Sequence, residues 1–113
     1  MPVTTKQITN YSVSVFSNAE PGQVSAAVLL FDSAGKAVAF LRFYPPGAAT
    51  PANEFRKDLE YALVSYPQAS LSAVLDVLRN EKPLFFTWHD HLPERCYGAV
   101  GTSREPIGEG HEA

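Results

Sequence analysis

Two strand-like runs in the first half of the chain constrain the fold more than any other feature. Residues 24–31 and 36–44 are apolar at almost every position, and a short turn ending in Gly35 joins them. A strand with one face in water alternates apolar and polar residues, whereas a strand buried on both faces reads as a continuous apolar run. We therefore expect both strands to lie in the middle of a sheet, with cover on each face.

The spacing of apolar residues predicts the remaining elements. Residues 8–16 alternate, which indicates a strand with one wet face near a sheet edge. Apolar residues at helical spacing follow Thr50 and Pro51, a pair typical of a helix start, and Ser70 precedes a second such stripe. The expected order is strand, strand, strand, helix, helix, strand, strand, at residues 8–16, 24–31, 36–44, 51–66, 71–80, 83–88 and 95–102.

Strands grouped around one helical block predict an α+β fold. We expect a mostly antiparallel five-stranded sheet with both helices packed on one face, forming a single domain over residues 1–102. An acidic, glycine-rich tail follows at residues 103–113, and its one large apolar residue, Ile107, is a candidate anchor. Because the helices cover only one sheet face, the other face needs a partner. A second copy is the simplest partner, since two-fold dimers are the commonest oligomers.

Composition and charge exclude several classes of protein. The 113 residues are 45% hydrophobic and 19% charged, as in a soluble globular domain. The net charge is −3 and the basic residues are scattered, which argues against nucleic-acid binding. No run approaches the ~20 apolar residues of a membrane span, and the first residues lack the apolar core of a signal peptide. With a single cysteine the chain forms no internal disulfide, and we expect it to be cytoplasmic.

The best candidate metal ligands are His89 and His91. Residues i and i+2 of a strand point to the same side, so both imidazoles could reach one zinc or other divalent ion. A defined site needs a third ligand, for which Glu94, Cys96, His111 and a tail glutamate are available. The alternative is that the two histidines decorate an exposed hairpin turn at residues 89–93.

Two further features have simpler structural explanations. Cys96 lacks a local catalytic signature and shares strand parity with Gly98 and Val100, so we expect it to face the core. Residues 98–103 resemble a phosphate loop only in composition, because no lysine and no helix follow the glycines. Packing of Phe85 or Trp88 across Gly98 would account for the small residues.

The sequence contains no motif that identifies a reaction. We expect a non-enzymatic domain, a homodimer that binds a protein or small ligand, with a pocket where residues 44–51 and the turn at residues 89–93 approach the sheet end. One alternative is a small metalloprotein or enzyme that uses His89 and His91. The other is a structural subunit of a larger assembly.

Overall fold

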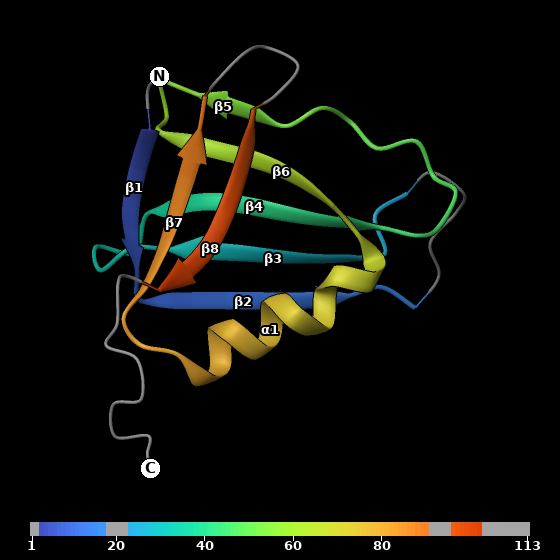
Figure 1. The fold of residues 1–113 in the computed structure, drawn as a ribbon, viewed down its shortest axis with the longest axis horizontal. Coiled ribbons are helices and arrows are strands. Elements are labelled where there is room, and N and C mark those ends of the chain that lie inside the picture. Colours follow the sequence, from blue (N-terminus) through green and yellow to red (C-terminus); the bar gives the residue numbers. More distant parts are fainter. Residues whose placement is uncertain (1–2, 18–22, 91–95, 103–113) are drawn as a thin grey trace.

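The computed structural model describes residues 3–17, 23–90 and 96–102. These residues form two β-sheets and one α-helix (Figure 1). The strands are β1 (Val3–Ile8), β2 (Asn10–Val15), β3 (Ala26–Phe31), β4 (Ala37–Tyr44), β5 (Glu54–Arg56), β6 (Tyr61–Pro67), β7 (Leu84–His89) and β8 (Tyr97–Thr102). A 3₁₀ turn, η1 (Gln68–Ser70), leads into the helix α1 (Leu71–Asn80).

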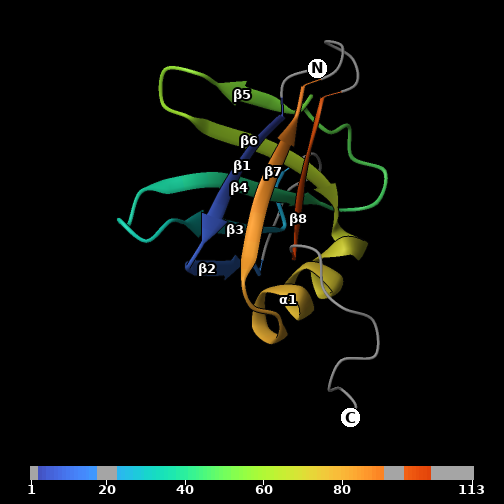
Figure 2. The same cartoon turned by 60° about the vertical axis from the view of Figure 1, so that its left-hand side comes forward.

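The strands divide into a five-stranded and a three-stranded sheet. The larger sheet has the order β2-β3-β4-β6-β5, and all its pairs are antiparallel except β4 with β6. The smaller sheet has the order β1-β7-β8 and is antiparallel throughout. The strands of the smaller sheet run across one face of the larger sheet. Helix α1 lies on that same face, beside the smaller sheet (Figures 1 and 2). The chain passes from one sheet to the other at Thr9, between β1 and β2.

The predicted single sheet with two packed helices is therefore wrong, although the chain does combine α and β elements. The first expected helix, at residues 51–66, is instead β5 and β6. Strand β6 buries Ala62 and Val64 on its inner face while Leu63 points to the other face, so its apolar residues also satisfy a period of two. Strand β1 was not predicted, because only its two end residues are apolar.

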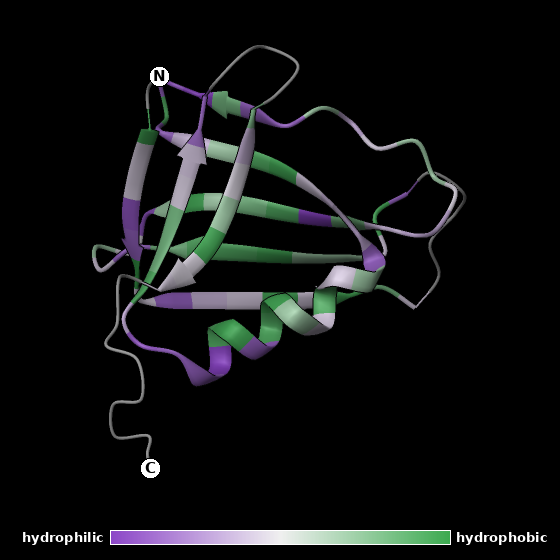
Figure 3. Cartoon of the chain, in the orientation of Figure 1, coloured by the Kyte–Doolittle hydropathy of each residue, from purple (hydrophilic) through white to green (hydrophobic). Residues whose placement is uncertain are grey.

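Other predictions are confirmed at the level of the element. The two apolar runs form β3 and β4, which lie inside the larger sheet and are green along most of their length in Figure 3. Gly35 closes their turn with a φ of +82°, a conformation that favours glycine. The Asp32 carboxylate accepts hydrogen bonds from the amides of Ala34 and Lys36 at 3.0 and 2.9 Å. The predicted edge strand is β2, at the border of the larger sheet.

One hydrophobic core joins the two sheets and the helix. The inner face of the larger sheet contributes three rows across β3, β4 and β6: Ala26–Phe43–Tyr66, Val28–Leu41–Val64 and Leu30–Ala39–Ala62. Strand β7 supplies Leu84, Phe86 and Trp88, and α1 supplies Val74 and Leu78. These three residues alternate along β7 and share its buried face. Its cover comes mainly from the opposite sheet, where the Phe55 and Trp88 rings stack with centroids 5.7 Å apart.

No helix in the described part of the chain has the length and apolar character needed to cross a membrane.

Candidate functional site

Of the two predicted metal ligands, His89 is described and is the last residue of β7. His89 pairs with Tyr97 across the two strands, and their rings stack with centroids 4.4 Å apart. The Cys96 thiol donates a hydrogen bond to the Asp90 carboxylate, with Sγ and Oδ1 3.2 Å apart. His91, like Glu94 and His111, lies outside the described residues. Within residues 3–17, 23–90 and 96–102, no three His, Cys, Asp or Glu side chains gather as a metal site would require. The two-histidine site therefore stays a prediction.

Cys96 and Gly98 both lie against side chains of the hydrophobic core. Cys96 is half-buried and packs against the core, as its strand parity predicts. A Cβ atom added to Gly98 would lie 2.6 Å from Cζ of Phe86 and 2.9 Å from Cγ2 of Val64. The aromatic ring beside Gly98 is therefore Phe86, from the buried face of β7. The expectation of packing was correct, but Phe85 is not the ring that occupies this space.

The outer face of the larger sheet is the strongest candidate functional surface. One row of paired residues runs across all five strands of this sheet: Ser12, Leu29, Phe40, Leu63 and Glu54. The three central members are apolar and the two at the sheet edges are polar. None of the three belongs to the core or packs against it. We call the half-buried side chains Leu29, Phe31, Phe40, Arg42, Tyr61 and Leu63 the outer patch.

Arg42 occupies the middle of the neighbouring row, between Ala27 on β3 and Ser65 on β6. Its Nε atom is buried and has no hydrogen-bond partner among the described residues. A buried donor without an acceptor is unfavourable, so such a group in a native protein calls for an explanation. Burial raises the pKa of the nearby Tyr61 hydroxyl, and the positive charges of Arg42 and Arg56 act in the opposite direction.

The described part of the chain also has cavities away from the outer patch, including three of about 310, 390 and 480 Å³. The loop after β4 lines one of about 390 Å³, from Tyr44 to Thr50. Its opposite wall is formed by residues 65–69, and residues 91–93 of the turn that was expected beside it lie outside the described residues. A second cavity of about 310 Å³ separates α1 from β8. The third and largest, about 480 Å³, lies where β1 turns into β2 beside the end of α1.

Sequence reasoning missed parts of both the outer patch and the largest cavity. Leu63 and Tyr61 were assigned to a helix, so their position beside Phe40 on a sheet could not be foreseen. The aromatic and β-branched residues of Tyr61–Pro67 were the available strand signal. The largest cavity depends on β1, whose polar sequence does not predict a strand.

Comparison of the chain with protein-family models, with curated proteins and with solved structures finds no match.

Proposed function

We propose that this chain is a non-enzymatic association domain that forms a homodimer through the outer patch. The observation that carries the proposal is the row Leu29–Phe40–Leu63, an apolar centre between polar sheet edges. Beside it lies the buried Nε of Arg42, which has no hydrogen-bond partner in the described part of the chain. Protein interfaces have this composition, with an apolar centre and a polar rim. Arginine is also enriched among the residues that dominate binding energy.

A second copy of the chain is the occupant that we favour. In a face-to-face pair of sheets, a two-fold axis parallel to the strands would set each Arg42 against its copy. An axis across the strands instead keeps the two guanidinium groups apart, and brings each toward the end of the partner's patch that carries Phe31 and Tyr61. Arginine stacks favourably on such aromatic rings. Self-association of this kind forms a closed dimer and leaves no further copy of the patch exposed.

The test is the mass in solution of the wild-type chain and of a Phe40→Glu variant. The wild type is expected at twice the 12.3 kDa chain mass at micromolar concentration, by light scattering or native mass spectrometry. Burying a glutamate at the patch centre should weaken the dimer by more than about thirtyfold. Leu59→Glu is the matched control, because Leu59 is 52% exposed in the turn between β5 and β6. A wild-type monomer, or equal effects of the two substitutions, would contradict the proposal.

The two alternative functions would be recognised by what remains bound to the purified wild-type chain. Zinc retained after purification without a metal-affinity tag would favour a metalloprotein that uses His89 and His91. Stable copurification of a different protein would favour a subunit of a larger assembly. The cytoplasmic location stays a prediction from the sequence.

A further inference from the structure

The cavity of about 480 Å³ lies at the corner where the chain passes from the smaller sheet into the larger one. Strand β1 ends at Ile8 and β2 begins at Asn10, so the chain changes sheets within one residue. The amide of Thr9 still donates to the carbonyl of Phe31 at 2.9 Å, which anchors this corner to β3. In sheets that cross at a steep angle, corners of this kind are made by strands that bend from one sheet into the other. Here the cavity is closed on one side by the C-terminal turn of α1 and by the start of β7.

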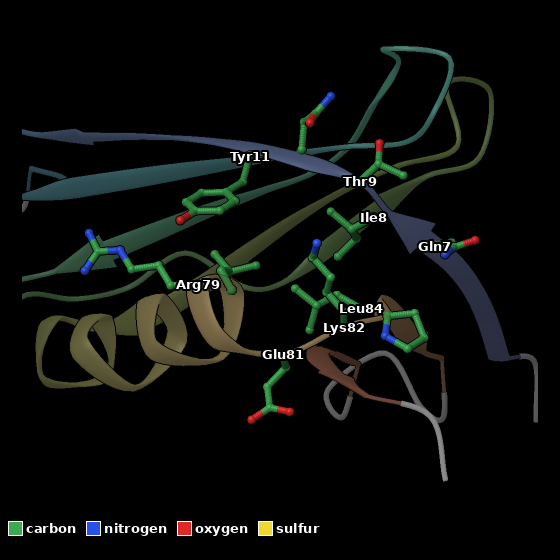
Figure 4. Close-up of a pocket in the computed structure, with 11 residues that line it drawn as sticks. Gln7, Ile8, Thr9, Tyr11, Arg79, Glu81, Lys82 and Leu84 are labelled. Atoms are coloured by element: carbon green, nitrogen blue, oxygen red, sulfur yellow. The ribbon is translucent and has the colours of Figure 1, made fainter. Parts of the chain in front are cut away.

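The cavity has an apolar floor. Its volume is about 480 Å³, within the range of small-molecule sites. Ile8, Leu78 and Leu84 line it and are 6%, 6% and 8% exposed, so the cavity reaches the edge of the core. The Tyr11 ring projects from β2 toward α1 and forms a further wall (Figure 4). These surfaces suit the apolar body of a ligand.

The rim of the cavity carries positive charge from two side chains, Arg79 and Lys82. Figure 4 shows Lys82 extending toward Ile8 across the cavity, whereas Arg79 extends away from Lys82 on the far side of Tyr11, and the carboxylate of Glu81 points out of the cavity. Among the described residues, neither Arg79 nor Lys82 takes part in an ion pair. Glu81 also lines the cavity and carries one negative charge, and the end of α1 contributes about half a negative charge, so the two positive charges leave a small positive excess. The remaining polar lining residues, Gln7, Thr9 and Asn10, are neutral.

From this combination we infer that the corner cavity binds a small amphipathic monoanion, with an apolar body and one carboxylate. The body lies on Ile8, Leu78 and Leu84, and the carboxylate accepts a hydrogen bond from Lys82, while Arg79 adds a second positive charge at the rim. Charge-assisted bonds of this kind are about twice as strong as neutral ones. The site is separate from the outer patch, because Ile8, Leu78 and Leu84 belong to the core on the inner side of the larger sheet.

Calorimetry with two probes, decanoate and 2-naphthoate, tests the inference on the wild-type chain. At least one probe should bind at least tenfold more tightly than the matching neutral alcohol, decanol or 2-naphthylmethanol. In amide NMR spectra the binding probe should shift Ile8, Tyr11, Leu78 and Leu84. Equal binding of the alcohol, shifts centred on the outer patch, or failure of both carboxylates to bind would overturn the inference.

Charge variants distinguish specific recognition from adsorption to apolar surface. Lys82→Gln should weaken carboxylate binding by about five- to tenfold, Arg79→Gln should weaken it less, and neither should change alcohol binding. Lys57→Gln is the control, since Lys57 is an exposed lysine outside the cavity. Carboxylate affinity that is unchanged in both cavity variants would also overturn the inference. None of the three substitutions should change the oligomeric mass, so this result is independent of the proposed dimer.

Discussion

At the scale of the residue, Gly98 is where β8 approaches the core most closely. Phe86 and Val64 are each 2% exposed and surround the place that a side chain at position 98 would occupy. Gly98→Ala should lower the free energy of unfolding by about 1–3 kcal/mol, because buried neighbours must move to admit the methyl group. Urea denaturation measures the change. Gly101→Ala lies on the same strand with nothing within 4 Å, so it should have little effect; equal losses would mean that crowding is not the cause.

A substitution of Arg42 should affect the stability of the monomer and the stability of the dimer in different ways. Arg42→Met keeps the apolar stem and removes the buried Nε that lacks an acceptor. In the monomeric Phe40→Glu background, this substitution should leave the melting temperature unchanged or raise it, because an unsatisfied donor is removed. In the wild-type background it should weaken the dimer by at least about tenfold, as expected for an interfacial arginine. A lower monomer melting temperature would show that Arg42 serves the folded chain alone.

Glu60 predicts a pH dependence of stability. Its carboxylate accepts a hydrogen bond from the Lys6 ammonium at 2.8 Å, and this bond, together with the charges of Lys6 and Lys36, lowers its pKa below the ordinary 4.5. A carboxylate whose pKa is lower in the folded state than in the unfolded state stabilises the fold at pH values above the unfolded pKa. This stabilisation is lost as the pH falls through the folded pKa. Glu60→Gln should therefore lower the melting temperature slightly at pH 7, and the difference should shrink as the pH falls below 4.5 and vanish below the folded pKa of Glu60. A difference that persists in acid would assign the effect to the backbone, where Glu60 has a φ of 51°.

At the scale of the element, the sequence predicted where some strands lie better than it predicted which strands pair with each other. The continuous apolar runs of β3 and β4 were recognised because burial on both faces leaves a local signature. Strand β6 was mistaken for a helix because Phe55, Leu59 and Leu63 also fit a helical stripe. Its pairing with β4 is parallel and spans the 16 residues between Tyr44 and Tyr61. Such long-range pairing leaves no trace in a local window of sequence, and it determines the outer patch.

The short strand β5 depends on one aromatic contact. Phe55 stacks on Trp88 of the opposite sheet, and β5 has only three residues. Phe55→Ala should destabilise the fold by about 2 kcal/mol, less than the ~3–5 kcal/mol of a fully buried phenylalanine, because Phe55 is half-buried. Trp88 is the chain's single tryptophan, so its fluorescence should shift to longer wavelength as water reaches the ring. Phe16→Ala, at a residue that is 48% exposed, should change neither quantity.

At the scale of the whole molecule, the proposed dimer couples folding to concentration. The larger sheet buries one face against the smaller sheet and α1, whereas its outer patch has no cover among the described elements. If the folded chain is a dimer and the unfolded chain a monomer, mass action raises the melting temperature with concentration. For a chain of this size we expect about 3 °C for each tenfold increase. Phe40→Glu should remove this dependence and Leu59→Glu should retain it. If the wild-type melting temperature stays constant when the protein concentration is raised about a hundredfold from the micromolar range, the outer patch serves a different partner.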